Sequence, residues 1–265
     1  MPRVKAEAAN DVWTLDFKGW FRTRDGQRVN PLTVRDRATR YVLRVQHVER
    51  ADERGVGAIM RRLFRRYGVP RSIHVDNGPP FGGVGPRGWS TLAVGWVRLG
   101  INVTYSRPGC PQDNAEHEQM HQVLQAQTAR PAAATVAAQQ GRFERWQWKY
   151  NCDRPNRALG MRLPSALYRP SERRPTMERW TYPIHWHVAR MDPRGRFHWA
   201  GAKRVIGKAF GRQVVALKPV RTGVVAVYFG PHLLGELHAR DPGAIRPVAV
   251  RHGRTRSTPS NRRGG

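Results

Sequence analysis

The chain has 265 residues, of which 47 are Lys or Arg and 19 are Asp or Glu, so its formal net charge is +28. Small soluble domains usually carry a net charge of about 2 to 8 in magnitude, and the excess here predicts a partner with dense negative charge, such as nucleic acid. No apolar run reaches the roughly 18 to 20 residues of a membrane span, Met1–Asn10 has no apolar signal core, and two cysteines exclude a disulfide scaffold, so we expect a cytoplasmic protein.

The first part of the chain predicts three strands before any helix. Polar and apolar residues alternate over Val12–Phe17, which indicates a half-buried strand from which Asp16 projects. Asp25-Gly26 is a favoured hairpin turn. Gln27–Leu32 and Tyr41–His47 are therefore predicted as the second and third strands.

The most regular helical pattern covers residues 52–67, where apolar residues recur at helical spacing until Gly68 and Pro70 end it. Alternation and turn residues then predict a strand, a helix, a strand and a helix at Ser72–Val75, Ser90–Leu99, Ile101–Tyr105 and residues 113–128. A further helix, rich in Ala and Gln, is predicted over residues 132–149.

The pattern changes after residue 170. Residues 171–185 are expected to be a linker, and residues 186–250 a small β domain. The strands predicted in that domain are Val214–Leu217, Val224–Phe229 and Leu233–Leu237. Residues 251–265 are rich in Arg, Ser and Gly and are expected to form a disordered basic tail.

Three acidic residues lie on or beside the predicted elements: Asp16 in the first strand, Asp76 after the strand Ser72–Val75, and Glu118 in the helix 113–128. Carboxylates that converge from separate elements repel one another, and a hard cation such as Mg²⁺ relieves that repulsion. Two such ions about 3.5 to 4 Å apart can support phosphoryl transfer. The spacing leaves open an alternative in which Asp76 caps a turn and Glu118 is a solvated helix residue.

Several short sequence motifs contain or lie between these acids, in a fixed order along the chain. They are Trp13-Thr14-Leu15-Asp16-Phe17-Lys18-Gly19, Pro31-Leu32-Thr33, Asp36, Tyr67-Gly68-Val69-Pro70, Asp76-Asn77-Gly78-Pro79-Pro80-Phe81, Leu99-Gly100-Ile101, and Arg107-Pro108-Gly109-Cys110-Pro111-Gln112 through Glu118 and His121. With Tyr150-Asn151, Arg154-Pro155 and Ala158-Leu159, they resemble the retroviral-integrase-type catalytic core of bacterial insertion-sequence DDE transposases.

The resemblance implies an α/β fold, with an RNase H-like mixed sheet flanked by helices and a small C-terminal β-barrel-like domain. Residues 1–10 would be a linker remnant, and residues 11–170 the integrase-type core with a helical extension. Asp16, Asp76 and Glu118 would be the catalytic residues and would bind Mg²⁺ or Mn²⁺, as two ions.

The implied activity is that of a DDE-type polynucleotidyl transferase, which performs DNA cleavage and strand transfer without a covalent enzyme intermediate. Its partners would be double-stranded DNA, both element ends and target, and further copies of the chain in a nucleoid-associated multimer. The family usually carries an N-terminal helix-turn-helix region, and we expect this recogniser to be absent here. An alternative is therefore a catalytically impaired DNA-binding fragment or a regulator of transposition.

Basic residues near the acids are candidates for DNA contact, because Lys and Arg supply most sequence-independent affinity for phosphates. Lys18, Arg107 and Arg154 are the candidates, together with His121 on the predicted helix.

Two further alternatives remain at this stage. His117-Glu118-Gln119-Met120-His121 matches the H-E-x-x-H pattern of zinc proteases, although that function would leave Asp16, Asp76 and the charge unexplained. A plain ribonuclease H is possible on fold alone.

Overall fold

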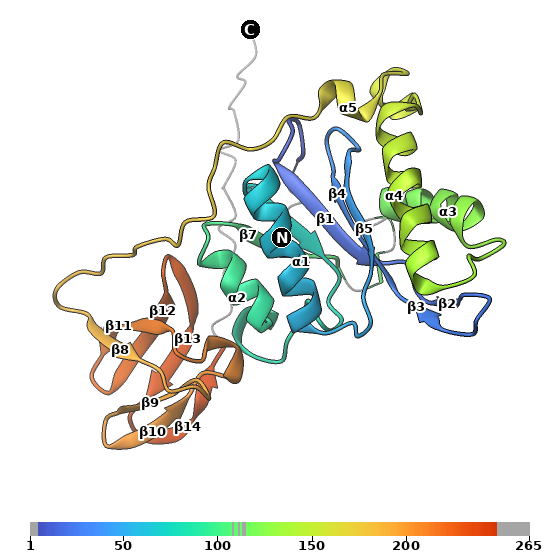
Figure 1. Ribbon diagram of the computed structural model, residues 1–265. Coiled ribbons are helices and arrows are strands. Elements are labelled where there is room, and N and C mark those ends of the chain that lie inside the picture. The colour runs from blue at the N-terminus through green and yellow to red at the C-terminus, as the bar shows by residue number, and fades with distance from the viewer. Residues whose placement is uncertain (1–4, 108, 111, 113–114, 248–265) are drawn as a thin grey trace, which may run out of the picture.

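The computed structural model describes residues 5–107, 109–110, 112 and 115–247. They form a core of one sheet and several helices and a smaller, antiparallel β unit, connected by an extended segment (Figure 1). The tail predicted at 251–265 lies outside the described residues. Within the described part, no helix is long and apolar enough to cross a membrane.

The core is built on a five-stranded sheet with the order β5-β4-β1-β6-β7. Its strands are β1 Val12–Phe17, β4 Pro31–Asp36, β5 Val42–His47, β6 Ser72–Val75 and β7 Asn102–Tyr105. β4 pairs antiparallel with both β1 and β5, whereas β6 pairs parallel with β1 and β7. The predicted α/β fold with a mixed sheet is confirmed.

The bounds predicted for the second strand, Gln27–Leu32, are wrong. A short hairpin precedes β4, with β2 at Phe21–Arg22 and β3 at Arg28–Val29. Asn30 interrupts the strand, because its backbone amide donates to Nδ1 of His47 at 3.1 Å instead of continuing the ladder. Pro31 has no amide proton, which suits the first residue of β4.

The helices of the core are α1 Glu53–Tyr67, α2 Thr91–Val97, α3 Ala115–Thr128, α4 Val136–Cys152 and α5 Pro164–Leu167, with short 3₁₀ turns at Pro86–Gly88 and Arg157–Leu159. The side chain of Asp52 accepts a hydrogen bond from the amide of Gly55 and caps α1. Gly68 ends α1 at φ 73°, and a Cβ there would lie 2.2 Å from the Ser171 carbonyl oxygen, so glycine is required.

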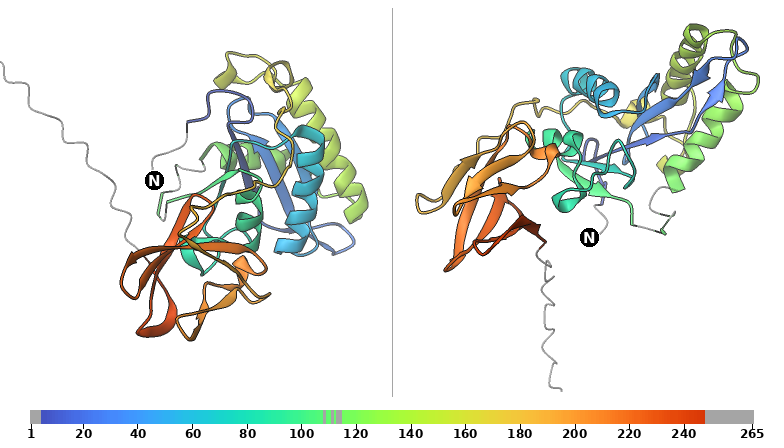
Figure 2. Two further views of the ribbon diagram at one scale, coloured as in Figure 1. Left: turned by 90° about the vertical axis from the view of Figure 1, so that its left-hand side faces the viewer. Right: turned by 90° about the horizontal axis from the view of Figure 1, so that it is seen from below.

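α1 and α3 lie on opposite faces of the central sheet (Figure 2). Because side chains alternate along a strand, Trp13 and Leu15 pack toward α1, and the Trp13 and Phe64 rings stack at 5.9 Å. Thr14 and Asp16 project to the other face, toward α3. β1 and β4 therefore present mainly apolar side chains toward α1 and polar ones toward α3, and we call the latter side the polar face. At the edge of that side, Val42 and Val45 of β5 pack with Met120 and Leu124 of α3.

α4 closes the free edge of β5 with side-chain amides. Asn151 accepts from the amide of Val42 and donates to its carbonyl, and Gln147 accepts from the amide of Val45. Gln140 bonds the amide of His47 and the carbonyl of Val45 in the same way. These bonds occupy backbone groups through which an open edge strand could pair with another chain.

The segment expected to be a linker is bonded along the core. Ser171 donates to the Tyr67 carbonyl from its backbone amide, and Arg173 donates to the carbonyls of Pro70 and Gly100 from its guanidinium. The composition of residues 171–185, rich in Pro and charged residues, predicts the absence of regular structure. It does not predict these hydrogen bonds with the core.

The C-terminal unit has a five-stranded antiparallel sheet, β14-β13-β12-β11-β8, and a β9-β10 hairpin. Its elements are β8 His187–Arg190, β9 Arg196–Trp199, β10 Ala202–Val205, a 3₁₀ turn Lys208–Phe210, β11 Val214–Arg221, β12 Val224–Phe229, β13 His232–His238 and β14 Asp241–Arg246. Phe210 and Phe229 pack on Trp89, in the loop between β6 and α2, at ring distances of 6.1 and 6.4 Å. The unit thus contacts the loop that follows Asp76.

Candidate active site

Two of the three predicted acids lie at the carboxyl ends of adjacent parallel strands. In the register of β1 and β6, Thr14 is the partner of His74. Two residues further along each strand bring the chain to Asp16 and Asp76, on the same polar face. Neighbouring strands are about 4.8 Å apart, so Asp16 and Asp76 occupy neighbouring backbone positions at this end of the sheet.

The loop after Asp76 is held against the end of β7. The side-chain amide of Asn77 donates to the Ser106 carbonyl at 2.5 Å, and the Tyr105 hydroxyl donates to the Phe81 carbonyl at 3.2 Å. Partial burial raises the pKa of Asp76, and a hydrogen bond from the Gly78 amide opposes that rise.

α3 meets the polar face through two buried histidines. Nε2 of His117 and Nε2 of His121 lie 2.6 and 2.7 Å from the Thr33 hydroxyl, which donates to the carbonyl of Asp16 at 3.0 Å. Since that hydroxyl has one proton and two lone pairs, both imidazoles donate to it. His121 Nδ1 is 3.9 Å from a carboxylate oxygen of Asp16, which brings α3 beside the first acid.

Both imidazoles are neutral in the folded protein. Burial, with the nearby charges of Lys18 and Arg35, lowers the pKa of His121 to about 3. Burial also lowers the pKa of His117 well below its ordinary value, and the charge of Arg35 adds to the effect. The pair therefore acts as a polar packing surface between α3 and the sheet.

The two glutamates in the first turn of α3 have different environments. Glu116 pairs with three arginines of the β4 region: Arg40 contacts both its carboxylate oxygens, and Arg35 and Arg37 each lie at 3.6 Å. Although burial acts in the opposite direction, these arginines hold the pKa of Glu116 below its ordinary value. Glu118 is exposed and forms no hydrogen bond or ion pair with any residue that the structure describes.

The donor set fits a hard divalent cation in its chemistry, because all three side chains offer carboxylate oxygens. Their arrangement fits it in part. The register brings Asp16 and Asp76 to adjacent strand ends, and His121 of α3 lies 3.9 Å from Asp16. In the described ranges, however, no three His, Cys, Asp or Glu side chains lie close enough together to hold a metal ion.

The candidate DNA-binding residues divide into two groups. Lys18 follows Asp16 by two positions on the polar face, and Arg107 is exposed in the loop after β7, at the same end of the sheet. Arg154 is not near the acids, because α4 runs past Val42 toward the opposite end of the sheet, and its guanidinium lies over the Tyr150 ring at 5.8 Å. His121 is 5% exposed and contacts Thr33.

The H-E-x-x-H pattern is used in a different way from that of a zinc protease. Nδ1 of His117 is bonded to the Thr14 hydroxyl at 3.0 Å, so both its ring nitrogens have partners on the sheet. This geometry does not favour the protease alternative.

The core is thus an α/β domain with a five-stranded mixed sheet, in which Asp16 lies near the end of the central strand and Asp76 follows the parallel strand beside it. Residues 6–111 and 99–164 match two family models, each described as an integrase core domain. The chain therefore belongs to the integrase core family, as the sequence motifs indicated.

A curated relative is an uncharacterised 31.7 kDa protein of insertion element IS407 from Burkholderia multivorans, 26% identical over 168 residues, 60% of this chain. The chain matches 56% of that relative's length. Similar structures include the intasome of simian T-cell lymphotropic virus in complex with PP2A regulatory subunit B56 gamma, at 18% identity and TM-score 0.51 over 95% of this chain and 84% of that one. Another is the HTLV-2 integrase catalytic core in complex with magnesium, at 11% identity and TM-score 0.44 over 62% of this chain and 99% of that one. The intasome match confirms the predicted fold.

Sequence reasoning missed the residues that fix α3 to the sheet, namely Thr14, Thr33, Glu116 and the three arginines around it. One signal was present. Thr14 and Thr33 are polar residues at buried positions of their strands, and buried polar residues need partners.

Proposed function

We propose that this chain is the catalytic part of a DNA transposase, which cleaves a phosphodiester bond and joins the freed 3′-hydroxyl to a target duplex. The observation that carries the proposal is the pairing of β1 with β6, which brings Asp16 and Asp76 to adjacent strand ends on the face covered by α3. Membership of the integrase core family supports the same reaction class.

The three carboxylates would hold Mg²⁺ or Mn²⁺, as two ions, which when bound supply Lewis acidity and charge neutralisation at the scissile phosphate. Asp16 lies in β1, and Asp76 directly follows β6 and accepts a hydrogen bond from the Gly78 amide. Glu118 completes the set from α3, where none of the residues that the structure describes forms an ion pair with it, whereas Glu116 is engaged by three arginines. The arginine cluster thus anchors the helix that presents Glu118.

Other residues of this chain would bind and orient the substrate. Lys18 and Arg107 lie at the acidic end of the sheet, where they can contact phosphates on either side of the scissile bond. His121, buried against Thr33, is better suited to hold α3 on the sheet than to touch DNA. The joining step then requires the 3′-hydroxyl to lie in line with the phosphorus atom of the target.

The test is nicking and joining of labelled duplex DNA by the purified chain with Mg²⁺ or Mn²⁺. Glu118→Gln is the test variant and Glu172→Gln the matched control, because Glu172 is exposed in the segment after α5. We expect metal-dependent activity in the wild type and the control, and its loss in Glu118→Gln and in EDTA. DNA binding without activity in any sample would favour the alternative of a non-catalytic fragment or regulator.

A further inference from the structure

Helix α1 carries a dense row of arginines on its solvent side. Arg54, Arg61, Arg62, Arg65 and Arg66 are all exposed, and together we call them the α1 ridge. At a rise of about 1.5 Å per residue, the ridge extends about 18 Å from its first member to its last. The opposite side of the helix packs on the sheet through Val56, Met60, Leu63 and Phe64.

Among the described residues, the α1 ridge has no acidic partners, in contrast to three arginine–carboxylate pairs elsewhere in the protein. Arg40 pairs with Glu116, Arg196 with Asp192, and Arg246 with Asp241. In the part of the chain that the structure describes, no ridge guanidinium forms an ion pair. The acids nearest the ridge have other partners, since Glu53 accepts from the Thr91 amide and Glu144 pairs with Arg44.

This arrangement works against the stability of the isolated helix. Arg61 and Arg65 are four residues apart, as are Arg62 and Arg66, and like charges at this spacing repel. Arg54 lies in the first turn, where the positive end of the helix dipole disfavours a cation. Both costs disappear when a polyanion lies along the helix, which points to a ligand with closely spaced phosphates.

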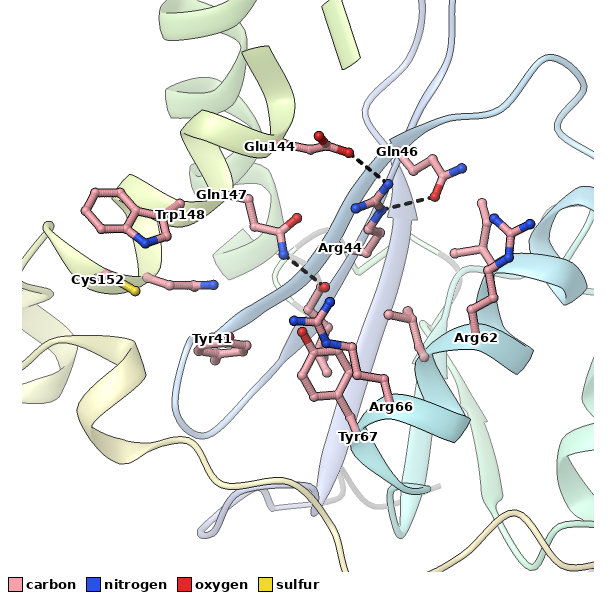
Figure 3. A pocket seen from close by; sticks show the side chains of 14 residues that line it. Tyr41, Arg44, Gln46, Arg62, Arg66, Tyr67, Glu144, Gln147, Trp148 and Cys152 are labelled. Atoms are coloured by element: carbon pink, nitrogen blue, oxygen red, sulfur yellow. Dashed lines mark hydrogen bonds and ion pairs between the residues drawn. The ribbon is translucent and has the colours of Figure 1, made fainter. Parts of the chain in front are cut away.

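One side of the ridge borders a cavity of about 400 Å³ between α1, β5 and α4. Arg62 and Arg66 line it from α1, Arg44 from β5, and Trp148 from α4 (Figure 3). The Trp148 side chain is 61% exposed, so its ring is free to pack on a sugar or a base. Cations beside an exposed aromatic ring are a common combination in nucleic-acid-binding surfaces.

The α1 ridge lies across the sheet from the candidate active site. Trp13 and Leu15 face α1, whereas Asp16 projects toward α3. The phosphates beside the scissile bond therefore lie against the other face of the sheet. We propose that the α1 ridge binds the phosphate backbone of a second DNA duplex, so that the protein bridges two duplexes. This inference rests on the proposed function for its choice of DNA as the polyanion.

The test measures bridging without catalysis. In EDTA, the full chain is bound to an immobilised duplex, washed, and offered a labelled second duplex over a salt series. The ridge variant carries Arg61→Gln, Arg62→Gln, Arg65→Gln and Arg66→Gln. The control variant removes the same charge from exposed arginines of the C-terminal unit, Arg190→Gln, Arg194→Gln, Arg221→Gln and Arg240→Gln.

We expect the ridge variant to lose capture of the second duplex by at least tenfold, with the salt slope of capture reduced by about 2 to 4. The control variant should keep most of its capture. Equal loss in both variants, or no loss in the ridge variant, would overturn the inference. Two double variants, Arg61→Gln with Arg65→Gln and Arg62→Gln with Arg66→Gln, each compared by thermal unfolding, separate a binding defect from misfolding.

The outcome does not depend on chemistry at the carboxylates, because no divalent cation is present. If Glu118→Gln leaves nicking unchanged while capture still requires the ridge, the proposed function fails and the bridging inference survives. If Glu118→Gln abolishes nicking and the ridge variant captures the second duplex as well as the wild type does, the proposed function survives and the bridging inference fails.

Discussion

The two faces of the central sheet differ in the side chains that β1, β4 and β6 supply, which are mostly apolar toward α1 and mostly polar toward α3. Toward α1, the strands present Trp13, Leu15, Leu32, Val34, Ile73 and Val75. Toward α3, they present Thr14, Asp16, Thr33 and Arg35, which contact side chains or carbonyls of that helix. Apolar side chains pack stably where their shapes fit together, whereas each buried polar group also needs a specific hydrogen-bond partner.

Because of this difference, we expect the α1 face to contribute mainly to stability and the α3 face mainly to the chemistry of the site. The α1 face buries large apolar side chains and supplies a rigid platform. The α3 face holds the acids at its edge and contains a network in which each hydroxyl and imidazole has a defined partner. Substitutions on the two faces should therefore change different measured quantities.

The largest effect is expected from Asp16→Asn or Asp76→Asn at the edge of the polar face. Each should lower metal-dependent nicking by on the order of 10³-fold or more, because a carboxylate ligand near the reacting phosphate is lost. Stability should be unchanged or slightly higher, since removing one of two neighbouring like charges relieves repulsion. Nicking rates and urea unfolding of the same preparations check both parts, and a large loss of stability would contradict the division.

A core substitution on the apolar face should do the reverse. Phe64 is 2% exposed and stacks on Trp13, so Phe64→Ala should lower the free energy of unfolding by about 3 to 5 kcal/mol. Nicking per folded molecule should stay within about threefold of wild type, which corresponds to less than about 1 kcal/mol in the barrier. Urea unfolding and activity at a temperature where the variant is folded provide the measurements. A specific loss of activity in the folded variant would show that the faces are coupled.

The sequence predicted the parts of this comparison that depend on local pattern. Alternation gave the bounds of β1 and β6 and placed Asp16 on a strand, and helical spacing identified α1. The role of Glu116 could not be predicted, because Arg35 and Arg40 lie far away in sequence and meet it only in the tertiary fold.

The C-terminal unit shows the same limit. Its three predicted strands carry clear apolar runs, whereas β8, β9 and β10 are four residues long and rich in His, Lys and Arg, and β14 contains Pro242 and Gly243. Such strands form by pairing with neighbours already in place, and their own propensity is weak. The position of Arg154 was misjudged for a related reason, since the direction of α4 along β5 follows from contacts through Gln140 and Asn151.

The smallest effect concerns Asp36, a buried carboxylate opposite Trp13 on the apolar side. It accepts hydrogen bonds from the amides of Asn10 and Thr39 and from the Thr39 hydroxyl. Asp36→Asn would turn an amide group toward a backbone donor, and should lower the free energy of unfolding by about 1 to 2 kcal/mol at neutral pH. Nicking should not change.

The pH dependence of the stability difference between this variant and the wild type tests whether burial or hydrogen bonding dominates at the Asp36 carboxyl group. Burial raises the pKa of Asp36 in the folded protein, and the hydrogen bonds from Thr39 and Asn10 oppose the rise without cancelling it. The folded state therefore binds the proton more tightly than the unfolded state, so the stability that Asp36 contributes is full below its unfolded pKa and is lost as the pH rises through the folded one. Asparagine does not titrate, so the Asp36→Asn variant lacks this pH-dependent contribution to stability. In urea unfolding between pH 7 and pH 4, the gap between wild type and variant should widen as the pH falls, and a gap that narrows instead would mean that the hydrogen bonds outweigh burial at this carboxylate.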